Sequence, residues 1–76
     1  MELNRPIHLA VDTHIGVIFV LDSGNNAVKI LRLADTELLD VVVHPEIHDP
    51  RRLAVDPSLR HMVVATEDGR IFLFSY

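Results

Sequence analysis

The tetrapeptide Leu-Ala-Val-Asp occurs twice in this chain, at 9–12 and again at 53–56, 44 positions later. Pro6 returns in the same register as Pro50, and the apolar run at 18–21 is matched by a second run at 62–65. A repeat of this period is typical of solenoids and propellers, in which each unit buries its hydrophobic face against the next one. The repeat therefore constrains the architecture more strongly than any other feature.

The composition is that of a small globular chain. Of its 76 residues 49% are hydrophobic, but a core of this size is marginal without a staple or a partner. There is no cysteine, so disulfides and thiolate metal sites are excluded. The net charge is −4 with dispersed basic residues, which argues against DNA as a partner. The first residues resemble neither a signal peptide nor a membrane helix, so we expect a cytoplasmic protein with no membrane partner.

The first repeat, approximately 6–43, is expected to form four short antiparallel strands. Turn residues separate them, and they cover 7–12, 17–21, 27–33 and 37–43. The second strand is apolar at every position, so we expect neighbouring sheets to cover both its faces. The segment 27–43 could also be drawn as an amphipathic helix. The repeat favours strands, because 27–33 aligns with the aromatic, β-favouring segment 70–76.

The second repeat, approximately 50–76, is expected to supply only three strands. A proline-punctuated loop at 44–49 leads into it, and strands follow at 51–56, 61–66 and 70–76. No residues remain for a fourth strand, which leaves one edge of the second sheet open. The fold class predicted is all-β, with antiparallel four-stranded propeller-type sheets: one complete, and three strands of a second.

With this pattern in place, the segment 6–33 resembles an NHL repeat, and its most specific part is Phe-Val-Leu-Asp-Ser-Gly-Asn-Asn at 19–26. The second copy keeps the first strand but has Thr-Glu-Asp-Gly at 66–69 in place of the Asp-Ser-Gly-Asn-Asn turn. The resemblance implies blades of a β-propeller, of which this chain has fewer than two. It also implies binding of protein or RNA partners through a loop face.

Loops at one end of such blades should share a face, and this is the candidate binding site. The alternative is that its polar residues only satisfy turns and contact water. The candidate partner-binding residues are Ser23, Asn25, Asn26, His44, Glu46, His48, Asp49, Arg51, Glu67, Asp68 and Arg70.

Other chemistry is weakly indicated. His44 and His48 have the His-x-x-x-His spacing, but Pro45 lies between them and no further ligands are set, so we expect no metal and no cofactor. Asp12 and Asp56 precede turn residues and are expected to cap backbone amides rather than act as a catalytic pair. No nucleophile elbow surrounds Ser23.

The sequence thus predicts a non-catalytic β-propeller repeat module, or a fragment of a longer propeller. It is expected to act as a scaffold that binds another protein, or further copies of itself, through its loop face and open edges. RNA binding is the first alternative, and it would depend on arginine contacts to the phosphate groups. The second alternative is a fragment of a propeller hydrolase or lyase. It has to be a fragment, because such an enzyme site would need residues from a closed ring.

Overall fold

In the computed structural model, which describes residues 2–76, the protein is all-β. The first sheet has strand order β1-β2-β3-β4 and the second β5-β6-β7, with every neighbouring pair antiparallel. Within 2–76 there is no helix long and apolar enough to span a membrane. The strands are β1 (Pro6–Asp12), β2 (Val17–Asp22), β3 (Ala27–Arg32), β4 (Leu38–Val43), β5 (Pro50–Asp56), β6 (His61–Thr66) and β7 (Ile71–Ser75).

These bounds confirm the predicted strand order, and the repeat extends to the details of the backbone. β5 and β6 begin 44 residues after β1 and β2, and the register shift near Pro6 in the β1–β2 pair recurs near Pro50 in the β5–β6 pair. The helical alternative for 27–43 is wrong, because this segment forms β3 and β4. Positive φ angles recur at equivalent positions: Arg5 and Asp49, Gly16 and Arg60, Asn26 and Gly69.

The turns use the residues that the sequence indicated. Asp12 Oδ1 accepts from the amide of His14 at 3.0 Å, and Asp56 Oδ1 accepts from the amide of Ser58 at 3.1 Å, so both aspartates cap turns as predicted. The β2–β3 turn is a short 3-10 segment, Ser23–Asn25, and Asn26 takes the left-handed conformation after it. Gly24 is needed there for space, because a Cβ would come within 2.5 Å of the Asn4 carbonyl oxygen.

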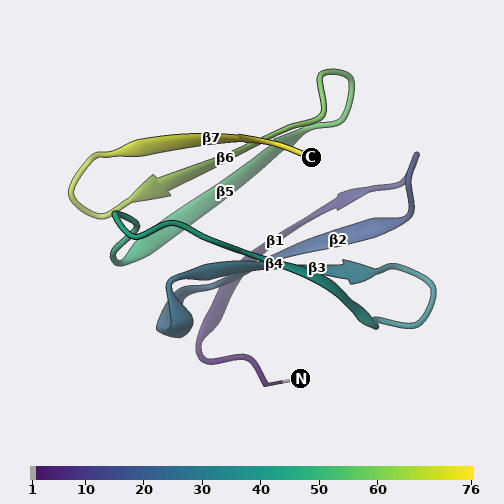
Figure 1. The fold of residues 1–76 in the computed structure, drawn as a ribbon, viewed down its shortest axis with the longest axis horizontal. Coiled ribbons are helices and arrows are strands. Elements are labelled where there is room, and N and C mark those ends of the chain that lie inside the picture. The colour runs from purple at the N-terminus through teal and green to yellow at the C-terminus, as the bar shows by residue number, and fades with distance from the viewer. Residues whose placement is uncertain (1) are drawn as a thin grey trace.

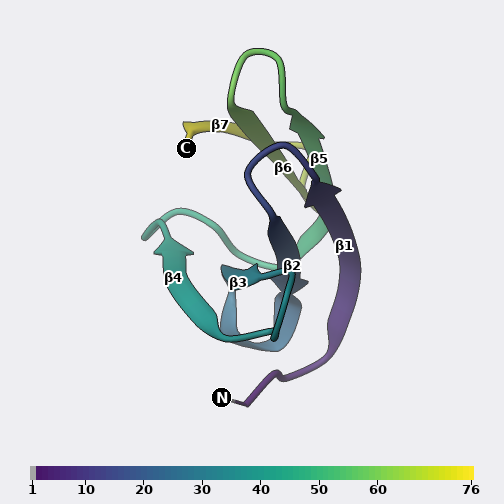
Figure 2. The same ribbon diagram turned by 90° about the vertical axis from the view of Figure 1, so that its right-hand side faces the viewer.

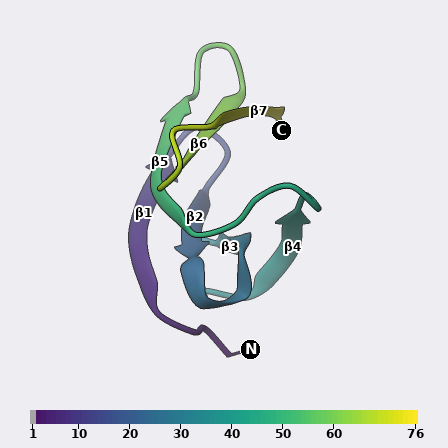
Figure 3. The same cartoon turned by 90° about the vertical axis from the view of Figure 1, so that its left-hand side faces the viewer.

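The two sheets pack face to face around one hydrophobic core. Phe19 and Leu21 from the first sheet are fully buried against Met62 and Val64 from the second. Figure 1 shows the β5–β7 sheet lying above the β1–β4 sheet. In Figures 2 and 3, β1 and β5 run along one side of the molecule, while β4 and β7 lie on the other.

Only one face of β2 is covered by a neighbouring sheet, and here the sequence prediction needs correction. Val17, Phe19 and Leu21 point into the core, as expected. Val20 points to the opposite face, where it lies beside Leu3 and other side chains of the N-terminal segment rather than beneath a sheet. The segment that leads into β1 therefore replaces part of the layer that the apolar strand predicted.

Candidate functional site

The three loops that were predicted to share a face lie together at one end of the sheets. The amide of Asp49 donates to Asn26 Oδ1 at 3.2 Å, which joins the β4–β5 loop to the β2–β3 turn. The amide of Glu67 donates to the carbonyl oxygen of Asp49 at 3.1 Å, which joins the β6–β7 turn to the same loop. The β2–β3 turn, the β4–β5 loop and the β6–β7 turn thus form one polar surface, which we call the loop face.

Both arginines of the loop face are held between carboxylates. Arg51 contacts Asp49 at 3.2 Å and Glu67 at 3.3 Å. Arg70 contacts Glu46 at 3.4 Å and Asp68 at 3.7 Å. Exposed pairs of this kind add little stability, but they neutralise the two positive charges. Because four carboxylates surround two guanidinium groups, the loop face is acidic overall.

Asp68 is also held by its own turn. It accepts a hydrogen bond from the Thr66 hydroxyl, and this bond is the largest of the effects that lower the pKa of Asp68 below its usual value. Arg70 adds to the same shift through its charge. In the Thr-Glu-Asp-Gly turn, Thr66 and Asp68 therefore stabilise the turn by binding each other.

The β2–β3 turn contributes less surface than its polar composition indicates. Ser23 is buried, and its hydroxyl donates to the carbonyl oxygen of Arg5 at 2.8 Å. The Asn25 side chain is exposed but donates to Asp22 Oδ2 at 2.7 Å. Most hydrogen-bonding capacity at this turn is thus used inside the chain.

The two histidines of the β4–β5 loop do not form a shared site. His44 Nδ1 accepts from the amide of Glu46 at 3.1 Å, and its ring lies 5.2 Å from the ring of Phe72. His48 is exposed in the same loop. Among residues 2–76 no three His, Asp or Glu side chains are placed so that they could hold a metal ion.

Asp22 also precedes turn residues and was expected to have a structural role like that of Asp12 and Asp56, but it is buried and its partners were not predicted. It accepts from the amide of Asn4 at 2.6 Å and from Asn25, and it pairs with Lys29 at 2.8 Å. Burial alone would raise the pKa of Asp22, but the hydrogen bonds from Lys29, Asn25 and Asn4 together hold it below its usual value. This aspartate ties the N-terminal segment to the β2–β3 turn.

A second missed contact joins the end of the chain to the first repeat. The Tyr76 hydroxyl donates to Asp12 Oδ2 at 2.8 Å, and its ring lies 4.6 Å from that of Phe19. This hydrogen bond is the largest effect that lowers the pKa of Asp12. Burial, followed by the nearby Asp12 carboxylate, raises the pKa of Tyr76 to about 12. No signal in the sequence pairs positions 12 and 76.

The edge strands β1 and β5 are linked by a side chain. His8 Nδ1 accepts from the amide of Leu53 at 3.0 Å, so its other ring nitrogen carries the proton in the neutral form. This hydrogen bond crosses between the two sheets. It was also missed, because a histidine in an apolar strand gives no indication of a partner 45 residues away.

Exposed apolar side chains lie on the outer sides of the two sheets. The strand registers place five apolar side chains on each side. We name these the first outward face (Leu9, Val11, Ile18, Val20 and Leu31) and the second outward face (Ala54, Val63, Ala65, Ile71 and Leu73). Leu9 is 61% exposed, Ile71 72% and Leu73 61%. Neither face was identified as a site from the sequence.

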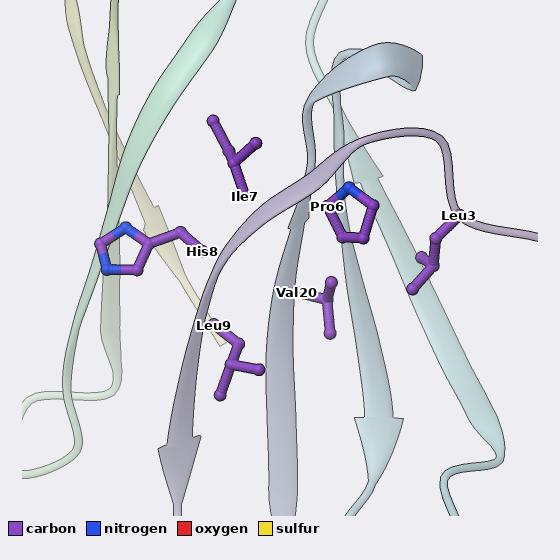
Figure 4. A pocket seen from close by; sticks show the side chains of 6 residues that line it. All are labelled: Leu3, Pro6, Ile7, His8, Leu9 and Val20. Atoms are coloured by element: carbon purple, nitrogen blue, oxygen red, sulfur yellow. The ribbon is translucent and has the colours of Figure 1, made fainter.

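A shallow apolar depression of about 560 Å³ opens at the first outward face. Figure 4 shows Leu3, Pro6 and Val20 around it, with Leu9 further along β1. Ile7 and His8 complete the lining, and His8 extends toward β5. The depression contains no cluster of polar groups, so its chemistry suits an apolar side chain.

Comparisons with protein-family models, with curated proteins and with solved structures gave no match for this chain. What can be said of its function depends on the geometry above.

Proposed function

We propose that this chain is a non-catalytic protein-interaction module made of two NHL-like, propeller-type repeats. The single observation that carries the proposal is the exposure of large apolar side chains on both outward faces, above all Leu9, Ile71 and Leu73. Exposed apolar side chains gathered on one face of a sheet are typical of surfaces that bind another protein. The open edge of β7 and the loop face lie beside these surfaces and supply polar contacts.

RNA binding has less support from the same residues. A phosphate backbone requires free cationic groups, whereas Arg51 and Arg70 are each engaged by two carboxylates. Stacking on bases requires accessible aromatic rings. Phe19 is fully buried, and Phe72 and Phe74 pack against the core.

The enzyme alternative also has less support than protein binding. Asp12, Asp22 and Asp56 each accept hydrogen bonds from within the chain, and all of them hold turns or chain segments in place. The apolar depression has only His8 as a polar group. A second depression of about 550 Å³ is lined by Ile7, His8, Arg51, Arg52 and Glu67, but Arg51 and Glu67 pair with each other at 3.3 Å. A catalytic site would need several polar groups converging on one cavity.

Site-specific photo-cross-linking tests the proposal. A photoreactive phenylalanine analogue is placed at Ile71 on the second outward face, and separately at Leu59, which is 63% exposed in the β5–β6 turn and serves as the matched control. In cells that produce the protein, we expect a protein adduct of discrete mass from position 71 and none from position 59. Equal labelling at both positions, or none at either, would overturn the proposal.

A further inference from the structure

Each outward face has the residue pattern of a face that is already buried inside the molecule. The first outward face contains Leu9 and Val20, and 44 residues later Leu53 and Val64 form part of the second sheet's half of the core. Leu53 is 4% exposed and Val64 0%. In the first outward face Leu9 is 61% exposed, while Val20 is 6% exposed beside Leu3. The first sheet therefore presents to the outside the kind of surface that the second sheet buries.

The second outward face repeats the other half of the same interface. Ala54 and Val63 stand 44 residues after Ala10 and Phe19, which belong to the first sheet's half of the core. The pairing registers extend the match, because Ile71 opposes Ala65 as Val28 opposes Leu21. The two exposed faces are thus equivalent to the two halves of the internal sheet–sheet interface.

The depression at the first outward face is where this equivalence is most visible. Leu3, which lines it, stands 44 residues before Ile47. Ile47 is 4% exposed and packs in the core, whereas Leu3 is 36% exposed. The same position is therefore filled by the neighbouring sheet in one repeat and open in the other (Figure 4).

From this equivalence we infer that the partner of each outward face is a second copy of this chain, stacked head to tail. The second outward face of one copy packs on the first outward face of the next, in the register that joins the two sheets within a chain. Ile71 and Leu73 then lie over the depression beside Leu3 and Val20. This inference rests on the proposed function and specifies its partner.

The contact is heterologous, which sets the form of the assembly. Each copy uses two different surfaces, so every added copy presents a new open face, and growth stops only when a ring closes. One element of the internal interface is not repeated. Arg52 occupies the position of His8 and carries only hydrogen-bond donors, so it cannot accept from the amide of Leu9 in the next copy. The junction between copies therefore lacks this hydrogen bond and has the charged guanidinium of Arg52 in place of the His8 ring.

Two half-blocked variants test the direction of stacking. Leu9→Asp places a charge on the first outward face, and Ile71→Asp places one on the second. Burying an unpaired charge in an apolar contact is strongly unfavourable, so each variant loses one of its two junctions. Both positions are mainly exposed in the single chain, at 61% and 72%, which keeps the effect on folding small.

The masses are measured by light scattering for each variant alone and for an equimolar mixture. We expect each variant alone to be a monomer of 8.6 kDa. In the mixture the intact second face of the Leu9→Asp chain meets the intact first face of the Ile71→Asp chain, and a dimer forms. The control Leu59→Asp should associate like the unaltered chain.

Other outcomes overturn the inference in distinguishable ways. A variant that dimerises alone would mean that like faces pair with each other. Two variants that remain monomeric when mixed would mean that the outward faces do not meet. A cross-linked adduct at position 71 with a different protein would overturn stacking of copies while supporting the proposed function. If an aspartate prevents folding, Leu9→Thr and Ile71→Thr place a polar but β-branched side chain at each position and are compared in the same way.

Discussion

Asp22 connects three parts of the first repeat through a single buried carboxylate. Its partners come from the N-terminal segment, the β2–β3 turn and β3, so its hydrogen bonds join elements that the sheet ladder alone does not join. The sequence predicted that the β2–β3 turn belongs to a binding surface. Asp22, which precedes this turn, is fully buried, and its carboxylate forms its hydrogen bonds within the chain.

Asp22→Asn is expected to lower the free energy of unfolding by about 1–3 kcal/mol, because it removes charge-assisted hydrogen bonds from a buried group. Urea unfolding at neutral pH measures this loss. The matched control is Asp35→Asn, since Asp35 pairs with Arg32 at the surface and should matter far less.

The loss caused by Asp22→Asn should also depend on pH. The folded state lowers the pKa of Asp22 below 3.8, so its carboxylate stabilises the fold above that pH and stops doing so as the pH falls below it. The difference between the unaltered chain and Asp22→Asn should therefore shrink in acid. A difference that stays constant down to the lowest pH would contradict this role.

Tyr76 makes the opposite prediction at high pH. Its pKa rises from 10.0 to about 12 in the folded state, so the neutral hydroxyl is favoured by folding. Between these two values the unfolded chain loses the proton first, and stability falls as the pH rises. Tyr76→Phe should be less stable than the unaltered chain at neutral pH and should lack this fall. Unfolding measured at several pH values between 8 and about 12 in both chains tests it.

At the scale of the elements, β2 has two faces with different surroundings. Phe19 is fully buried between the sheets, whereas Ile18 is only half-buried on the first outward face. Phe19→Ala should therefore cost about 3–5 kcal/mol, as expected for a large core residue. Ile18→Ala should cost about 1 kcal/mol, typical of a partly exposed position.

Both substitutions are best compared in chains that carry Ile71→Asp, so that self-association does not add to the measured stability. Chemical denaturation then reports the single chain. Equal losses for the two variants would show that both faces of β2 are covered to the same extent, and that the asymmetry described above is incorrect.

The strands were predictable because each signal for them is local or repeated. β2, Val17–Asp22, is an apolar run that ends at a turn aspartate, and the repeat supported the assignment by giving β1, β2 and β3 an equivalent strand in the second repeat. The third strand shows the value of the second copy, because 27–43 alone was compatible with a helix. The repeat also predicted that the polar loops would meet at one end of the sheets, as the Asn26–Asp49 contact shows.

The contacts between the two repeats could not be predicted, because no local sequence pattern indicates which residues of one repeat lie beside those of the other. The Tyr76–Asp12 and His8–Leu53 hydrogen bonds join positions 64 and 45 residues apart, and neither breaks a local rule that would reveal it. The covering of Val20 by Leu3 was missed for a different reason. An apolar strand indicates burial on both faces but does not say whether a sheet or a chain terminus supplies the cover.

At the scale of the whole molecule, the chain resembles two layers of a taller stack. One interface is buried between its sheets, and the halves of an equivalent interface are exposed on either side. In repeat proteins the stability of each unit depends on its neighbours, so a chain of two units has a high proportion of unpaired surface. Association would cover this surface and complete the pattern that the sequence repeat establishes.

The most direct test is the solution mass of the purified, unaltered chain, measured by light scattering across a dilution series together with circular dichroism. We predict a β-rich chain whose mass at higher concentration is a discrete multiple of 8.6 kDa and decreases on dilution. A chain that is folded and monomeric at every concentration would contradict the account, because both outward faces would then be stable in water without a partner.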